Sequence, residues 1–129
     1  MLIPNNLLYA ITHEWVAIDG EKARVGLTDY AQDALGDVVF FNLPEVGAEY
    51  EAGDAVGEVE SVKAVSDVYT PVGGVIIAVN KSLEDAPELV NTAPYDAWVF
   101  DIVIKSGSEA GALLKPDQYE KFCGEAASE

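Results

Sequence analysis

The sequence AVGEVESVKAVSDVYT, residues 55–70, contains the pattern that decides the fold. Its valines recur at every third position, namely Val56, Val59, Val62, Val65 and Val68. This spacing suits neither a straight strand, whose faces alternate every second residue, nor an α-helix with its period of about 3.6 residues. The β-branched side chains and Gly57 also disfavour a helix. We therefore predict two strands joined by a chain reversal near Val62 and Lys63, although the usual Asn-Gly or Asp-Gly turn pair is absent.

The rest of the chain predicts further short strands and a few helices. Thr28 is a good N-cap for a helix that ends at Gly36. Proline in the first turn and Gly124 past the end indicate a C-terminal helix over about residues 116–124. The predicted strands are Trp15–Asp19, Lys22–Leu27, Asp37–Leu43, Val75–Asn80 and Trp98–Lys105, and residues 83–91 are a loop or short helix around Pro87. This succession predicts a mainly β protein, a small sandwich or barrel with short helices.

The composition is that of a globular protein of single-domain length. The chain has 129 residues, of which 50% are hydrophobic and 23% charged. No segment reads as an interdomain linker, so we expect residues 1–129 to form one domain. No apolar run reaches the roughly 20 residues of a membrane span. No basic residue precedes the apolar patch in residues 1–10, so it resembles neither a signal nor a transit peptide, and we expect a cytoplasmic protein.

The net charge restricts the class of partner. A formal charge of −16 argues against binding to nucleic acids and anionic membranes, because both are polyanions. It favours attraction to positively charged proteins or solubility alone, and both remain open. The single cysteine, Cys123, cannot form an internal disulfide, and with the single histidine, His13, it makes no metal site. We expect Cys123 to face the body of the protein as a small apolar side chain.

Lys63 stands alone in an acidic region. Between Arg24 and Lys81 the sequence has ten acidic residues and one basic residue, Lys63. A lysine at an exposed tip is either an ordinary solvated side chain or an amine presented for modification. Its amine, with an unperturbed pKa of about 10, is a weak nucleophile at neutral pH and needs an activated acyl donor.

Residues 60–71, ESVKAVSDVYTP, closely resemble the lipoylation segment of the glycine cleavage H-protein family. The resemblance extends in order over nearly the whole chain. Its other blocks are THEWV at residues 12–16, GLTDYAQDALGD at 26–37, LPEVG at 43–47 and APELVN at 86–91. It implies a barrel-sandwich hybrid related to lipoyl and biotinyl domains, with a C-terminal helix, and with lipoate in amide linkage to Lys63 at the hairpin tip. Val62 and Ala64 look like the lipoyl version, because biotinyl domains usually flank their lysine with methionines.

The resemblance also implies a role and a set of partners. The family's carriers are not enzymes: they shuttle the aminomethyl group of glycine from a pyridoxal-phosphate glycine decarboxylase to a tetrahydrofolate-dependent aminomethyltransferase. They pass electrons to dihydrolipoamide dehydrogenase, and they are also substrates of lipoate-attaching enzymes. The cofactor supplies the chemistry in such a system, while the protein supplies position and protection.

Three residues match the positions that line the family's cleft for the loaded arm: Thr12, Glu14 and Asp67. Their chemistry suits a primary ammonium, which gains charge-assisted hydrogen bonds from carboxylates. The alternative for Glu14 and Asp67 is that they are two more surface acids. His13 resembles a catalytic base, but one histidine beside a tryptophan is more often structural.

Two departures and several alternatives remain. The segment Tyr95–Trp98 is shorter than in the family and lacks its glycine, which leaves the local loop shape open. The pair Phe40-Phe41 is bulkier than usual, which a core can absorb by repacking.

The chain is alternatively a biotin carrier or a lipoate-relay protein that donates lipoyl groups to 2-oxoacid dehydrogenases. The sequence shows no nucleophile–base pair and no metal-ligand set that would support an enzyme in its own right.

Overall fold

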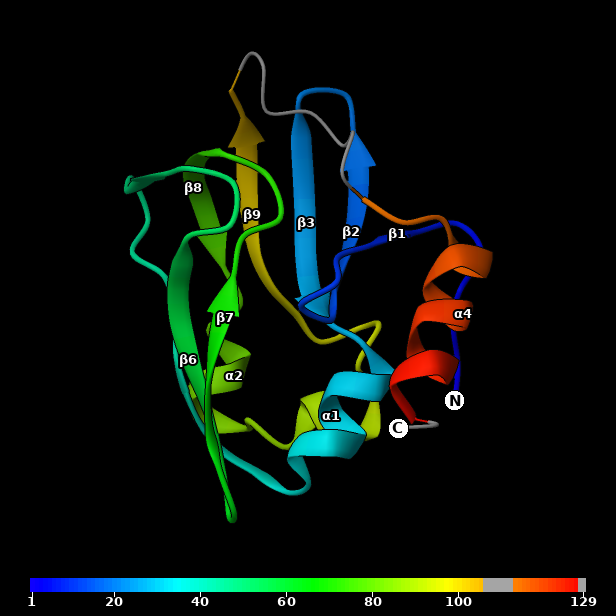
Figure 1. Ribbon diagram of the computed structural model, residues 1–129. Helices are drawn as coiled ribbons and strands as arrows, with labels where there is room; N and C mark the ends of the chain where they lie inside the picture. Colours follow the sequence, from blue (N-terminus) through cyan, green and yellow to red (C-terminus); the bar gives the residue numbers. More distant parts are fainter. Residues whose placement is uncertain (106–112, 128–129) are drawn as a thin grey trace.

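Two antiparallel sheets pack across one core in the computed structural model, which describes residues 1–105 and 113–127 (Figure 1). The first sheet has the strand order β1 (Leu8–Tyr9), β2 (Glu14–Asp19), β3 (Lys22–Leu27), β9 (Trp98–Ile104), β8 (Gly74–Val79) and β5 (Glu49–Tyr50). The second has the order β4 (Val38–Asn42), β6 (Ala55–Ser61) and β7 (Val65–Tyr69). The predicted mainly β fold with short helices is confirmed.

The β6–β7 hairpin explains the valine spacing. The chain reverses at Val62–Ala64, as predicted, and Glu60 pairs with Val65 across the tip. A register shift between Ala55 and Gly57 lets both Val56 and Val59 point into the core although they lie three residues apart, because a bulge resets the face that each following residue takes. The turn at the tip accounts for the rest of the valine spacing, since Val62 and Val65 are exposed there.

Four helices are described. They are α1 (Asp29–Leu35), α2 (Ser82–Asp85), α3 (Leu89–Thr92) and α4 (Pro116–Ala127). The Thr28 hydroxyl caps α1 by accepting from the Ala31 N–H, and the chain leaves this helix at Gly36 with φ 78°. The prediction that Gly124 ends the last helix is wrong, because α4 continues to Ala127. An internal glycine weakens a helix by only about 1 kcal/mol and does not stop it.

The two clusters of buried side chains position the site. The larger one joins both sheets, and the smaller one holds α4 against β1 and β2 through Tyr9, Trp15, Tyr119 and Cys123. Cys123 is buried, as predicted. Of the two adjacent phenylalanines, Phe41 enters the core and Phe40 remains half exposed. Among the described residues, no helix is both long and apolar enough to cross a bilayer.

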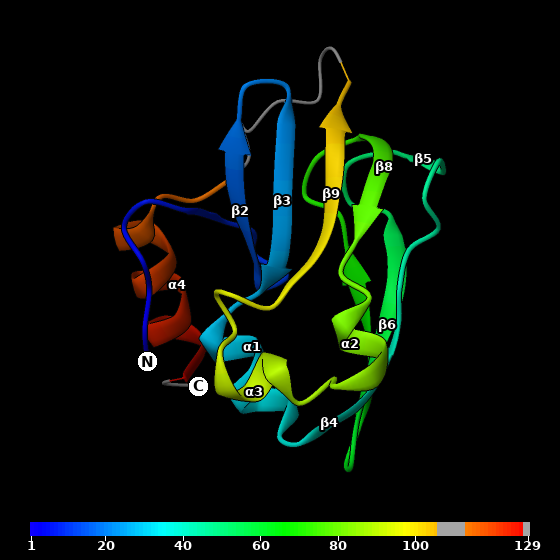
Figure 2. The same cartoon turned by 180° about the vertical axis from the view of Figure 1, so that it is seen from behind.

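The hairpin tip lies at the same end of the molecule as α1 and α3, in both the front view and the view from behind (Figures 1 and 2). The β2–β3 turn lies at the opposite end (Figure 1). The segment Tyr95–Trp98, whose shape the sequence left open, leads from α3 to β9. Its Tyr95 hydroxyl donates to the Leu2 carbonyl at 2.6 Å and accepts from the Asp29 N–H at 3.1 Å, which fixes the start of α1.

Candidate functional site

The tip of the β6–β7 hairpin is closed by Ser61 in place of an Asn-Gly pair. The Ser61 N–H donates to the Ala64 carbonyl at 2.8 Å, and the Ser61 hydroxyl accepts from the N–H groups of Lys63 at 3.3 Å and Ala64 at 3.1 Å. Serine side chains make such local turns because the hydroxyl can replace a backbone partner. Lys63 is exposed at the end of this compact turn.

The Lys63 side chain runs across Gly36 at the end of α1. Its Cε lies 3.3 Å, and its Nζ 3.7 Å, from the place that a Cβ at Gly36 would occupy. The backbone of Gly36, with φ 78° and ψ −153°, lies in a region that is almost restricted to glycine. A glycine is therefore needed here for the turn out of α1, whereas the flexible lysine stem would have to shift by only a few tenths of an ångström to admit a Cβ.

Asn91, at the α3 end of the APELVN block, ties this junction together. Its amide nitrogen donates to the Gly36 carbonyl at 2.8 Å and to Gln32 Oε1 at 3.1 Å, and its Oδ1 accepts from the Val38 N–H at 2.9 Å. Asp37 lies between Gly36 and Val38, both of which are bonded to Asn91, and its carbonyl accepts from the Val62 N–H at 3.0 Å. Sequence reasoning missed this role, because it depends on contacts between residues more than 50 positions apart.

A cavity of about 320 Å³ lies beside the tip, between α1, the loop before β2 and β7. Thr12, Glu14 and Asp67 all line it, so the structure brings the three predicted residues together. The other lining residues are His13, Leu27, Tyr30, Ala31, Ala34, Leu35, Val59, Ala64, Val65 and Ser66. The wall next to Lys63 is therefore apolar, and the two carboxyl groups lie among the polar lining residues.

Glu14 is the buried acid of this cavity. Only 1% of its surface is exposed. Burial raises the pKa of its carboxyl to about 8, against the hydrogen bonds from the Thr12 hydroxyl and the Tyr69 N–H, which lower it. The Thr12 hydroxyl donates to Oε1, and the Tyr69 N–H approaches Oε2 at 3.5 Å. The surface-acid alternative is thus wrong for Glu14.

Asp67 differs from Glu14 in its surroundings. It is exposed, and the contact of its Oδ2 with the Tyr69 hydroxyl is long, at 3.5 Å. No lysine or arginine is among the residues that line the cavity. The arrangement therefore offers one buried and one exposed carboxyl group, with a hydroxyl, to a small cation that enters from the Lys63 side.

His13 also lines the cavity, and its ring is held in place on several sides. Nδ1 is hydrogen-bonded to the Tyr119 hydroxyl at 2.7 Å, and the ring stacks on Tyr30 with centroids 4.3 Å apart. Burial lowers the pKa of His13 below its ordinary value, so the ring is neutral at pH 7. These are the contacts of a structural residue, as expected. The part played by Tyr119 was not foreseen, since nothing in the sequence links it to residue 13.

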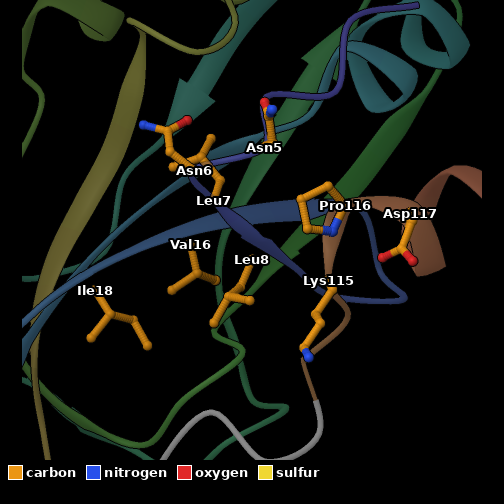
Figure 3. A pocket seen from close by; sticks show the side chains of 9 residues that line it. All are labelled: Asn5, Asn6, Leu7, Leu8, Val16, Ile18, Lys115, Pro116 and Asp117. Carbon is orange, nitrogen blue, oxygen red and sulfur yellow. The ribbon is translucent and has the colours of Figure 1, made fainter.

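A larger cavity, of about 550 Å³, lies elsewhere and shares no lining residue with the first. Figure 3 shows the side chains that line it, which come from the N-terminal segment, β1, β2 and the start of α4. Its apolar side is formed by Leu8, Val16 and Ile18. Neither Lys63 nor Glu14 lines it, so cavity size alone would select a different set of residues.

Comparison with known proteins gives a consistent result. The sequence model described as Glycine cleavage H-protein matches residues 7–126. Glycine cleavage system H proteins from Thermoanaerobacter sp. (strain X514) and Bacillus subtilis (strain 168) are 49% and 48% identical to this chain, and each alignment covers 97% of this chain and 99% of the relative. A crystal structure of a glycine cleavage system H protein from Mycobacterium marinum has a TM-score of 0.83 and 39% identity, and covers 97% of this chain and 99% of that one. With a lysine at the hairpin tip, a carboxyl-lined cavity beside it and relatives of this similarity over almost their full length, the chain belongs to the glycine cleavage H-protein family.

Proposed function

We propose that the chain is a single, non-catalytic lipoyl-carrier domain of a glycine cleavage system, with lipoate attached to Lys63. The observation that carries this proposal is the position of Lys63 in a chain of this family. Its amine is exposed at the end of a serine-closed turn, and its stem passes over Gly36 beside the cavity. A modifying enzyme can therefore reach the amine without unfolding the hairpin.

The surroundings fit a lipoyl amide. Ala34, Leu35, Ala64 and Val65 line the cavity next to the lysine and offer apolar surface to an aliphatic chain. When bound, the lipoyl group supplies a disulfide that accepts the aminomethyl unit and a dithiol that returns electrons to a flavin enzyme. Everything else in the proposal concerns what the side chains of this protein do.

Glu14 is proposed to hold the ammonium of the carried aminomethyl group. With its pKa raised to about 8, Glu14 is mostly protonated at pH 7 when no cation is near. A neighbouring ammonium favours the charged carboxylate, so Glu14 gives up its proton and accepts an N–H hydrogen bond in return. Thr12 keeps Oε1 oriented through its hydroxyl, and Asp67 adds negative charge from the exposed side.

Protection follows from the same contacts. Hydrolysis of the cargo consumes one water and releases formaldehyde and ammonium, leaving a thiol. Apolar walls and a fixed carboxylate limit the access of water to the carbon under attack. The proposal also includes a cytoplasmic location and a set of partners. These are the glycine decarboxylase, the aminomethyltransferase, dihydrolipoamide dehydrogenase and lipoate-attaching enzymes.

Mass spectrometry tests the attachment site. Full-length protein made in lipoate-supplied cells is expected to gain the mass of one lipoyl amide, and peptide mapping is expected to place it on Lys63. Lys63→Arg should fold but remain unmodified, because a guanidinium cannot take the place of the acylated amine. Lys81→Arg, which also replaces a surface lysine, should be modified like the parent.

The same samples separate the alternatives. Modification at Lys22 or Lys81 would sink the assignment, and the mass of a biotinyl group would indicate a biotin carrier. With a glycine decarboxylase, the lipoylated parent is expected to support CO2 release from glycine and Lys63→Arg is not. Transfer of the lipoyl group to a 2-oxoacid dehydrogenase without such support would favour the relay role.

A further inference from the structure

The loop between β1 and β2 has a histidine where such loops normally have glycine. Tyr9 pairs with Trp15, and residues 11–13 connect the two strands. In three-residue hairpin loops the last residue takes a left-handed backbone, which glycine adopts without strain. Here that residue is His13, with φ 71°, and among the described residues it is the only non-glycine with positive φ. Non-glycine residues are uncommon in this conformation, although histidine adopts it more often than most. The His13 carbonyl accepts from the Thr28 N–H at 3.2 Å, and contacts of the imidazole add to what holds the residue.

The polar contact of the imidazole comes from α4, whereas its stacking partner Tyr30 lies on α1. The Tyr119 hydroxyl is bonded both to His13 Nδ1, at 2.7 Å, and to the Thr28 hydroxyl, at 2.8 Å. Tyr119 is fully buried, and its ring stacks on Tyr9 with centroids 4.6 Å apart and planes 8° apart. Its position is therefore fixed from two sides, and it can serve as a rigid support for the imidazole.

The left-handed residue controls where its neighbours point. Thr12 and Glu14 lie on either side of His13, and all three line the cavity beside Lys63. The loop closes through the His13 N–H, which donates to the Ala10 carbonyl at 3.0 Å, and the Ala10 N–H, which donates to the Glu14 carbonyl at 2.9 Å. A change of φ at His13 would break this pairing and turn the Thr12 and Glu14 side chains out of their present directions.

We propose that Tyr119 is a positioning residue for the cavity, because its hydroxyl holds His13 in the left-handed conformation that directs Thr12 and Glu14 inward. The C-terminal helix is thereby a structural part of the site, although among the residues that line the cavity none comes from α4. The link to cargo protection rests on the proposed function, whereas the link to the position of Glu14 does not.

The first test needs no cofactor. In the unmodified full chain, carbon NMR of the Glu14 carboxyl is expected to give a pKa of about 8 in the parent. Tyr119→Phe keeps the buried ring but removes the hydroxyl, so the loop relaxes, water reaches Glu14 and its pKa falls toward the ordinary value of about 4.3. Tyr9→Phe is the matched control: it removes another hydroxyl of the same ring stack, one that donates to the Pro4 carbonyl, and should leave the Glu14 pKa unchanged.

A second background shows whether the effect passes through residue 13. Glycine takes the left-handed conformation unaided, so in a His13→Gly protein Tyr119→Phe is expected to cause no further change in the pKa of Glu14. An equal fall in both backgrounds would mean that Tyr119 acts by another route, and an unchanged pKa in Tyr119→Phe alone would also overturn the proposal. Loss of overall stability by itself does not produce this pattern at temperatures well below unfolding.

The third measurement separates this proposal from the proposed function. In lipoylated protein loaded with the aminomethyl group, formaldehyde release is expected to be about two- to tenfold faster in Tyr119→Phe, and faster in Glu14→Ala. In the double variant Tyr119→Phe should add nothing to Glu14→Ala. Equal release from the parent and Glu14→Ala would refute the sheltering role while the NMR result still decides on Tyr119. Faster release from Glu14→Ala with no change in Tyr119→Phe would refute the positioning role alone.

Discussion

Glu14 is a carboxyl group buried with hydrogen-bond donors but with no cation among the residues that line its cavity. A buried charge without a partner is unfavourable, so such a group stays protonated, and strongly shifted groups of this kind are enriched at functional sites. The hydroxyl of Thr12 satisfies one oxygen. The contact of the other oxygen with the Tyr69 N–H is long, at 3.5 Å, so this oxygen can accept a new donor.

Glu14→Gln is expected to change how stability depends on pH. The folded-state pKa of Glu14, about 8, exceeds its unfolded value of about 4.3. The folded state therefore keeps a proton that the unfolded state releases, and the stability contribution present at low pH is lost as pH rises between these values. Glutamine does not titrate. The free energy of unfolding of Glu14→Gln should therefore rise relative to that of the parent over this pH window and level off above it.

Urea unfolding at about pH 5, 7 and 9 measures the effect. Glu58→Gln removes an exposed carboxyl of the same length and reports the effect of the changed net charge alone. A constant difference between Glu14→Gln and the parent across this range would mean that the Glu14 carboxyl is in contact with water.

At the scale of elements, the junction of α1, β4 and the hairpin tip determines how Lys63 is presented. Asn91 holds Gly36 and Val38, and Asp37 between them holds Val62, the neighbour of the lysine. A side-chain amide supplies two N–H donors and one acceptor oxygen in a fixed plane, so it can replace a missing backbone partner on both sides of a turn. The tip is thereby fixed to a helix that also lines the cavity.

Asn91→Ala is expected to slow lipoylation of Lys63 several-fold and to lower stability by about 1–3 kcal/mol, because the Gly36 carbonyl and the Val38 N–H lose their partner. Initial rates of lipoate attachment well below the unfolding temperature measure the first effect, and urea unfolding measures the second. Asn80→Ala is the control, since the bond it loses, to the Ser82 N–H at 3.3 Å, is exposed. A less stable Asn91→Ala protein that is lipoylated at the parent rate would limit Asn91 to a structural role.

These elements also show what the sequence can predict. The hairpin, the N-cap at Thr28 and the strand run of Val38–Phe41 depend on neighbours in sequence, and all three are present. The bulge in β6, the continuation of α4 past Gly124 and the amide bonds of Asn91 depend on tertiary contacts, which override local preference. Thr12, Glu14 and Asp67 were selected by resemblance to a family, and no rule of spacing would have chosen them from among 23 acidic residues and their polar neighbours.

For the whole molecule, the charge distribution changes when the lysine is acylated. Lys63 is the one basic residue between Arg24 and Lys81, and amide formation would take the formal net charge from −16 to −17. Glu58 and Glu60 on β6 and Asp67 on β7 surround the tip. After acylation, all charged residues between Arg24 and Lys81 are acidic, which favours partners with basic surfaces around their active sites.

Association with such a partner is expected to slow as salt increases beyond physiological strength, where the Debye length is about 8 Å. Stopped-flow rates with a partner enzyme measure this. Glu58→Gln/Glu60→Gln near the tip should flatten the salt dependence more than Asp19→Asn/Glu21→Gln, which make the same charge change at the β2–β3 turn at the opposite end (Figure 1). Equal effects of the two pairs would leave net charge, and no local docking surface, as the cause.

The shortness of the hairpin tip has a further consequence for traffic among enzymes. Residues 62–64 are held to Ser61 and Asp37, so the tip stays tied to the segment that follows α1. Every enzyme that uses Lys63 must then approach the same end of the molecule, and while one occupies it the others wait. A partner with a long residence time would withhold the carrier from the next one, however tightly it bound. Throughput of the shared system therefore depends on quick departure, and long-range attraction that speeds arrival without prolonging the stay suits a carrier of this kind.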